Sequence, residues 1–238
     1  MKRTFISFFS VVILHCTAVA QSNFHKLSIG AGYGVTQSFT DVQEHAISFA
    51  GYGTADYFLT PFISLGGEFQ MGQIRGGDIY TDPNEREFIN SYKTANINGK
   101  LYLGSVINFN RNAFANAIKW FYIGAGAGII RNDVERVVVK PSTRNTANPY
   151  VFPGKDKSTD LVAPLSTGIN YYFSDRTGKP KFGINLNYQV NFSLGEGMDG
   201  YDDSPIKFKN GSPDVYTYLS FGFRYNFGLL GLSTKSLY

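Results

Sequence analysis

The sequence has little charge, almost no cysteine and no long apolar run. Cys16 is the single cysteine among 238 residues, and Asp, Glu, Lys and Arg together make up only 17% of the chain. Its apolar stretches are shorter than the roughly 20 residues that a membrane-spanning helix needs. These features exclude a disulfide-stabilised module, a strongly basic nucleic-acid-binding domain and a helical membrane protein.

Residues 1–20 have the composition of a cleavable export signal. Lys2 and Arg3 form a positive start, an apolar stretch follows, and Ala18-Val19-Ala20 supplies the small residues of a cleavage site. We therefore expect residues 1–20 to be a signal peptide and the mature chain to begin at Gln21.

The expected cleavage changes both the cysteine content and the charge. Cleavage after Ala20 removes Cys16, which leaves no disulfide and no cysteine-ligated metal site. A lipid anchor on Cys16 is the alternative, but it would need a small residue before the cysteine, and His15 is large. Losing Lys2 and Arg3 lowers the basic residues from 22 to 20 against 18 acidic ones, a net charge of about +2. We expect no nucleic-acid partner for so nearly neutral a chain.

Aromatic residues and glycine are abundant, and apolar residues alternate with polar ones. The chain contains 21 Phe, 16 Tyr and 26 Gly, a composition typical of strands that cross an outer membrane. From Phe182 to Leu194, every even position is large and apolar, and every odd one is Gly, Asn, Gln or Ser. Only the 180° step of a β-strand separates such residues onto two faces.

The same alternation recurs eight times along the chain. It predicts an all-β, eight-stranded antiparallel up-and-down transmembrane β-barrel within residues 21–227, and residues 228–238 would form a short C-terminal extension. The connections after the second, fourth and sixth strands are mostly shorter than the others, as in outer-membrane barrels, whose longer loops face outside. The expected strands are residues 27–35, 47–57, 63–73, 95–107, 121–129, 161–171, 182–194 and 215–227.

A soluble β-sandwich is the alternative fold, because its strands alternate too. Its solvent face should differ strongly in charge from its buried face, whereas the polar face here is mostly Gly, Asn, Ser and Tyr. Aromatic residues also gather near the short-turn end, as in the girdle at a membrane interface, although Trp120 and Tyr172 have inward parity. These residues are Tyr57, Phe62, Trp120, Phe121, Tyr171, Tyr172, Phe182, Tyr225 and Phe227.

With these features the chain resembles the small outer-membrane β-barrel family, which includes the barrels of outer-membrane proteins A and X. The resemblance covers residues 26–227 and rests on the export signal, the eight strands and the aromatic-ended last strand, YLSFGFRYNF at 218–227. The Ala20-Gln21 junction and the segment YFLTPFISLGGEF at 57–69 are similar to the Bacteroidota branch. The resemblance implies a location in the bacterial outer membrane, insertion by the barrel assembly machinery, and contact with outer-membrane lipid or lipopolysaccharide.

The resemblance also implies that a terminal aromatic residue, here Phe227, is the assembly signal. In the family this residue usually ends the chain, whereas residues 228–238 follow it here, and Tyr238 is the alternative signal. We expect the extension to lie in the periplasm and to be dispensable for assembly.

Four charged residues have inward parity: Asp56, Glu68, Lys100 and Arg224. Counting from the turns places Glu68 and Lys100 at similar depth on neighbouring strands, which predicts an ion pair. Arg224 and Asp56 flank the first strand, whose inward glycines would let the two meet. The lumen of an eight-stranded barrel is just wide enough for side chains, and buried charges must be paired. We therefore expect this lumen charge network to fill the barrel, with a gate or ion path as the alternative.

Other groups have the residue types of a functional site but lack its spacing. The segments GAGYG at 30–34 and GAGAG at 124–128 lack the G-x-G-x-x-G pattern of nucleotide sites, and we expect them to make room in the lumen. His45, Asp41 and Ser48 lie close in sequence and have the residue types of a lipid hydrolase or acyltransferase. Asp199, Asp202 and Asp203 have the residue type that binds a cation but lack EF-hand spacing.

The sequence therefore predicts a non-enzymatic outer-membrane protein with a structural or interaction role. Its extracellular loops would form the surface that contacts a protein partner or lipopolysaccharide. We predict no catalytic residue, metal site or cofactor. The alternatives are a narrow pore for small polar solutes and a lipid-modifying barrel enzyme, the latter favoured less.

Overall fold

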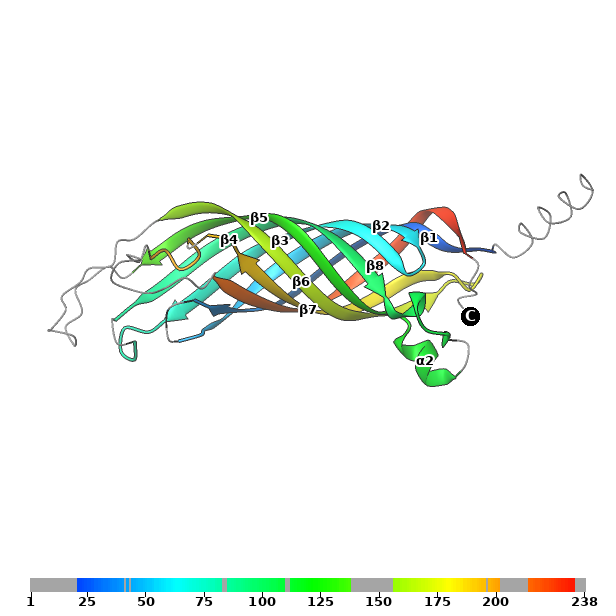
Figure 1. Cartoon of the computed structure of the whole chain (residues 1–238), viewed down its shortest axis with the longest axis horizontal. Helices are drawn as coiled ribbons and strands as arrows, with labels where there is room; N and C mark the ends of the chain where they lie inside the picture. Colours follow the sequence, from blue (N-terminus) through cyan, green and yellow to red (C-terminus); the bar gives the residue numbers. More distant parts are fainter. Residues whose placement is uncertain are drawn as a thin grey trace, which may run out of the picture.

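Eight antiparallel strands close into a barrel in the computed structural model, which describes residues 21–40, 42, 44–82, 85–109, 112–137, 156–195, 197–201 and 214–233. Each strand pairs with the next one along the chain, and β8 returns to pair with β1. The strands run obliquely along the barrel (Figure 1). They are β1 (Gln21–Phe39), β2 (Ile47–Thr60), β3 (Ile63–Gly77), β4 (Glu87–Tyr102), β5 (Phe121–Val137), β6 (Lys157–Ser174), β7 (Pro180–Ser193) and β8 (Val215–Ser233).

The eight-stranded up-and-down barrel expected from the alternation is confirmed, but most strands are longer than expected. The main error is β4, which ends at Tyr102 rather than at residue 107. A 3-10 turn, η1 (Leu103–Ser105), and a short helix, α2 (Ala113–Ile118), follow it. Asn112 caps α2 by accepting a hydrogen bond from the Ala115 amide at 2.7 Å. Among the described residues, no helix is long and apolar enough to cross a bilayer.

The extension expected at residues 228–238 is in part a continuation of the barrel. β8 runs through Ser233, and its last residues pair with the start of β1, where Gln21 lies opposite Ser233. Two register shifts in β1 and a positive φ of 82° at Gly228 interrupt the alternation here, which explains why it failed to predict these strand ends. The expected signal peptide and residues 234–238 lie outside the described residues.

The two ends of the barrel differ in their connections. At one end, which we call the short-turn end, lie the β2–β3, β4–β5 and β6–β7 connections, together with the start of β1 and the end of β8. At the other, the long-loop end, lie the β1–β2, β3–β4, β5–β6 and β7–β8 connections. Figure 1 shows α2 beyond the barrel wall at the short-turn end.

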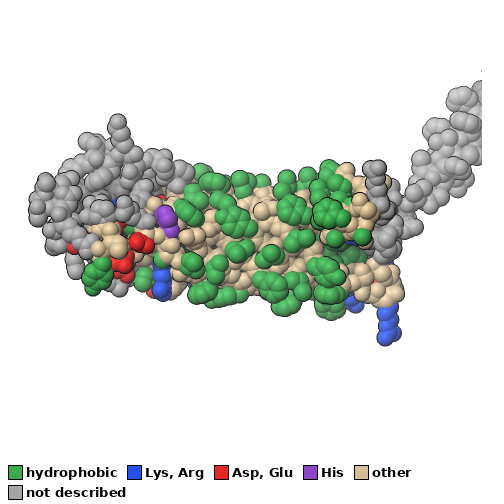
Figure 2. Space-filling model, turned by 90° about the horizontal axis from the view of Figure 1, so that it is seen from below, with side chains coloured by type: hydrophobic (Ala, Val, Ile, Leu, Met, Phe, Trp, Pro, Cys, Tyr) green, Lys and Arg blue, Asp and Glu red, His purple; other side chains and the backbone are tan. Residues whose placement is uncertain are grey.

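An apolar belt surrounds the middle of the barrel. Figure 2 shows hydrophobic side chains over its central part and charged ones toward the two ends. Ile97 is 74% exposed and Phe223 65%, and a soluble protein rarely exposes a contiguous apolar surface of this size. Together with the closed ladder, the belt is that of a barrel whose strands cross a membrane. Residues from all eight strands contribute, among them Ile29, Phe49, Leu65, Ile97, Ile123, Leu165, Leu186 and Phe223.

Candidate functional site

The lumen holds one carboxylate between two cations. Asp56 on β2 accepts hydrogen bonds from Lys100 Nζ at 3.0 and 3.3 Å, and it forms a salt bridge with Arg224 Nη2. Arg224 also donates from Nε and Nη2 to Ser28 Oγ at 3.3 Å. All four side chains are buried, so the attraction between these charges is only weakly screened by solvent.

Small residues on the intervening strands make this ion cluster possible. Asp56 and Lys100 lie on β2 and β4, and on β3 between them a Cβ at Gly66 would overlap the Asp56 carboxylate. Asp56 and Arg224 lie on either side of β1, where a Cβ at Gly30 would lie only 3.3 Å from Arg224 Cγ. The inward glycines thus allow side chains to meet across a whole strand, as expected for the Asp56–Arg224 contact.

The ion pair expected between Glu68 and Lys100 is wrong. Lys100 lies opposite Ser64, and Glu68 lies four residues farther along β3, opposite Asn96. The expectation counted depth from a turn at residue 107, but β4 already ends at Tyr102, which brings Lys100 nearer to the short-turn end. Lys100 therefore reaches Asp56, and Glu68 instead accepts a hydrogen bond from Gln70 Nε2 at 2.6 Å.

A network of amides and tyrosines fills the middle of the lumen. Gln70 Nε2 also donates to Gln189 Oε1 at 3.0 Å, and the hydroxyls of Tyr92 and Tyr216 donate to Gln70 Oε1 at 3.3 Å. All four side chains are almost wholly buried. Since these polar groups bond to one another across the barrel, the network links β3, β4, β7 and β8.

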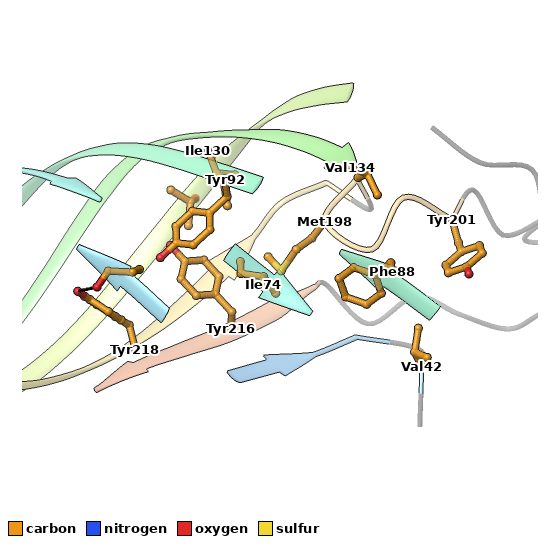
Figure 3. Close-up of a cluster of buried hydrophobic side chains, with 12 residues drawn as sticks. Val42, Ile74, Phe88, Tyr92, Ile130, Val134, Met198, Tyr201, Tyr216 and Tyr218 are labelled. Atoms are coloured by element: carbon orange, nitrogen blue, oxygen red, sulfur yellow. Dashed lines mark hydrogen bonds between the residues drawn. The ribbon is translucent and has the colours of Figure 1, made fainter. Parts of the chain in front are cut away.

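An apolar cluster, the long-loop cluster, packs inside the barrel toward the long-loop end. Met198, from the β7–β8 connection, is fully buried, and its side chain points between Ile74 and Phe88 (Figure 3). Asn90 Nδ2 donates to the Met198 carbonyl at 2.8 Å, which holds this segment in the barrel mouth. The cluster comprises Val42, Ala50, Ile74, Phe88, Tyr92, Ile130, Val134, Val162, Met198, Tyr201, Tyr216 and Tyr218.

Tyr201 fixes the same connection to β4. Its hydroxyl donates to the Glu87 carbonyl at 3.1 Å and accepts a hydrogen bond from the Glu87 amide at 3.0 Å. Burial raises the pKa of Tyr201 to about 12, although its hydrogen bond to Glu87 acts in the opposite direction. The phenol therefore stays neutral and remains a donor throughout the physiological pH range.

A second apolar cluster, the short-turn cluster, packs at the opposite end of the lumen. The Trp120 ring centroid lies 5.2 Å from that of Phe62 and 4.9 Å from that of Tyr172. Trp120 and Phe62 are buried, so they do not belong to the aromatic girdle at the membrane interface in which we expected them. The inward parity of Trp120 already indicated this. The cluster comprises Phe24, Phe58, Phe62, Tyr102, Phe109, Trp120 and Tyr122.

Lys119 borders this cluster beyond the end of the strands. Its Nζ lies 5.1 Å from the centroid of the Phe109 ring and donates to Asn116 Oδ1 at 2.6 Å. Desolvation by burial lowers the pKa of Lys119. A cavity of about 190 Å³ adjoins Lys119, Trp120 and Tyr171, between α2 and the end of β6.

The end of β8 helps to hold Phe24 in the short-turn cluster. Gly231 lies opposite Phe24, and a Cβ there would overlap the Phe24 ring. Phe24 itself is 4% exposed. Phe227 lies opposite Leu27, before this segment, and its ring stacks on Tyr225 at 5.9 Å. Its role as the assembly signal stays a prediction.

Of the groups considered for catalysis or metal binding, only His45, Ser48 and Asp199 lie in the described part of the chain. His45 is exposed and packs on Phe39 with ring centroids 4.9 Å apart, whereas Ser48 is buried on the lumen side of β2. Asp199 is buried and accepts a hydrogen bond from the Tyr201 amide at 3.0 Å. Within the described part of the chain, no three His, Cys, Asp or Glu residues could hold a metal ion together. Asp41, Asp202 and Asp203 lie outside it.

Comparison with known proteins gives similarities in structure only. No family model and no curated protein matches the sequence. Neisserial surface protein A is similar with a TM-score of 0.47 at 12% identity, over 87% of this chain and 99% of that one. Ail, the attachment invasion locus protein of Yersinia pestis, is similar with a TM-score of 0.43 at 11% identity, over 84% of this chain and 97% of that one. The N-terminal β-barrel domain of OprF from Pseudomonas aeruginosa is similar with a TM-score of 0.40 at 11% identity, over 84% of this chain and 98% of that one. Such similarity concerns the fold alone, and the barrel is established by its own strand pairing.

Proposed function

We propose that this chain is a non-enzymatic, non-conducting β-barrel of the bacterial outer membrane with a structural or interaction role. The side chains that bond to one another across the lumen are the observation that carries this proposal. Apolar clusters lie at both ends, and the Asp56 ion cluster and the Gln70 network lie between them. Because these side chains bond to one another rather than line an open channel, they favour a support for the barrel wall over a solute path.

The long-loop end is the contact surface in this proposal. Short turns face the periplasm in outer-membrane barrels and longer connections face outside, and an export signal at residues 1–20 would deliver the chain to this membrane. The bonds of Asn90 and Tyr201 hold residues 197–201 of the β7–β8 connection on β4 as a fixed platform at this end. A preorganised platform loses less conformational entropy when a partner binds.

The lumen is expected to conduct no steady ion current. In planar bilayers, the wild-type protein and the Glu68→Gln variant should both remain at baseline, because Glu68 and the Gln70 network bond side chains of four strands to one another across the lumen. Purified protein with a verified heat-dependent gel shift should be used, so that only closed barrels are measured. Steady conductance whose ion selectivity changes with Glu68→Gln would favour the pore alternative and contradict the proposal.

A specific partner is expected to depend on the long-loop end. Co-purification from native outer membranes in mild detergent should recover the partner with the wild-type chain. Recovery of the partner should be lost when residues 138–155 are replaced by a short Gly-Ser turn, because this change removes part of the proposed contact surface. The barrel itself should still close, since the β5–β6 ladder stays in place. The matched control replaces the β6–β7 turn, residues 175–179, at the other end and should leave recovery unchanged. Equal loss in both variants would contradict a contact surface at the long-loop end.

A further inference from the structure

Two cations face each other on the outer wall of the barrel. Lys93 on β4 and Arg131 on β5 are direct partners in the antiparallel register, and both side chains are exposed. Opposed residues of this kind have Cβ atoms about 5 Å apart, at which distance like charges destabilise a strand pair. Strand pairing alone therefore does not account for the two cations.

No acidic residue neutralises this pair within the described part of the chain. The nearest acids lie closer to the long-loop end and have other partners. Asp133, in the next row, forms a salt bridge with Lys157 at 3.3 Å, and Glu135, two residues beyond it, accepts a hydrogen bond from Ser91. Lys93 and Arg131 themselves make no ion pair or side-chain hydrogen bond with the described residues. Their neighbours in the same row are the uncharged Met71 and Thr159.

The pair lies at the edge of the apolar belt. The next outward residues toward the short-turn end are Ala95 and Ile129, which are paired with each other. From Phe121 to Arg131 a tilted strand rises about 25 Å along the membrane normal, which is the height of the apolar band of such barrels. Lys93 and Arg131 therefore lie at the level of the lipid headgroups on the long-loop side.

The wall is hollowed on the same two strands, six residues along each strand from the pair toward the short-turn end. In one row across four strands, Gly99 and Ala125 are paired in the middle, and Leu65 and Leu165 stand on either side. These residues line an open groove of about 550 Å³ on the outer wall. A soluble anion would use only the cations, whereas a lipid could place its headgroup on them and an acyl chain toward the groove.

We propose that Lys93 and Arg131 bind the phosphate of an anionic lipid in the leaflet next to the long loops. This inference rests on the proposed membrane location but does not depend on whether the lumen conducts. Arginine can bind a phosphate through two parallel hydrogen bonds, and lysine adds a second charge. The bound phosphate offsets the repulsion between the two side chains.

Lipid binding to the full chain in detergent tests the proposal, with native mass spectrometry as the readout. Phosphatidylglycerol should bind more tightly than phosphatidylcholine. The variant Lys93→Gln/Arg131→Gln should lose about thirtyfold in affinity, from roughly fivefold per basic residue at a charged membrane surface. The control Arg176→Gln/Lys181→Gln removes the same charge at the short-turn end and should bind as the wild type does. Equal binding of the two lipids, or equal losses in the two double variants, would overturn the proposal.

Two further measurements separate a lipid site from a soluble-anion site and from a purely structural pair. Gly99→Leu should weaken phosphatidylglycerol binding but leave the barrel closed, because a Cβ at this position meets only ordinary contacts of 3.6 Å or more. In a neutral detergent without anionic lipid, Lys93→Gln/Arg131→Gln should be at least as stable as the wild type, since a repulsion is removed. Inorganic phosphate that competes as well as the lipid would assign the pair to a soluble anion, and a destabilised double variant would assign it a structural role. Either result would overturn the lipid site.

Discussion

Replacing Asp56 with asparagine is expected to destabilise the barrel by about 3–5 kcal/mol, the usual cost of leaving buried charge unpaired. The substitution keeps the size of the side chain but removes the only carboxylate bonded to Lys100 and Arg224 among the described residues. The free energy of unfolding should be measured by urea titration in lipid vesicles. Trp120 is the single tryptophan of the chain and lies in the short-turn cluster, so its fluorescence reports the transition.

Glu68→Gln is the matched control, because it makes the same chemical change in the same lumen. Glu68 accepts a hydrogen bond from Gln70 and forms no salt bridge with a described residue, so an amide oxygen can replace its carboxylate oxygen. We expect a loss of about 1 kcal/mol or less, typical of a change in one hydrogen bond. Equal losses at Asp56 and Glu68 would show that the lumen does not distinguish the two carboxylates and would contradict the ion cluster.

Replacing Gly32 with valine is expected to prevent most of the chain from closing into a barrel. Gly32 faces the lumen, and a Cβ there would lie 2.6 Å from Gly222 Cα on β8 and 2.6 Å from the Tyr52 ring. Since one of these neighbours is backbone, the clash cannot be relieved by turning a side chain. We expect a cost of about 3 kcal/mol or more, measured as the fraction of refolded protein that shows the heat-dependent gel shift.

Gly53→Val is the control for backbone propensity. Gly53 lies on the neighbouring strand with outward parity, and the nearest atom to an added Cβ is the Gly30 carbonyl oxygen at 3.9 Å. Valine there should be neutral or slightly stabilising, because β-branched residues favour strands. If both variants failed to close, the loss would reflect glycine itself rather than lumen crowding.

Alternation was enough to predict the eight strands, since a lipid-facing wall and a polar lumen impose a period of two. Alternation failed to predict strand ends where a turn or a register shift interrupts the period of two. Leu103, Val106 and Ile107 continue the apolar character of β4, yet the chain turns after Tyr102, and the Phe62 ring packs against Gly104. At the start of β1, register shifts turn Phe24 inward, and neither shift has a signal in the sequence.

The lumen contacts were predictable only in part. Parity correctly indicated that Asp56, Glu68, Lys100 and Arg224 face inward, but depth depends on the residue at which each turn begins. An error of five residues at the end of β4 was enough to give Lys100 the wrong partner. The insertion of Met198 into the barrel mouth left no signal in the sequence, because it depends on where a long connection folds back rather than on a repeated pattern.

The pairing of β1 with β8 has a consequence for how the chain is made. Every other pairing joins consecutive strands, whereas this one joins residues about 200 positions apart, such as Gly30 and Arg224. The salt bridge between Arg224 and Asp56 spans the same junction, because β1 lies between their strands. Until β8 arrives, the incomplete sheet has two open edges. Of the four lumen charges named above, the two carboxylates of Asp56 and Glu68 are then offset by Lys100 alone. Neutralisation of these four charges is thereby coupled to the final strand pairing.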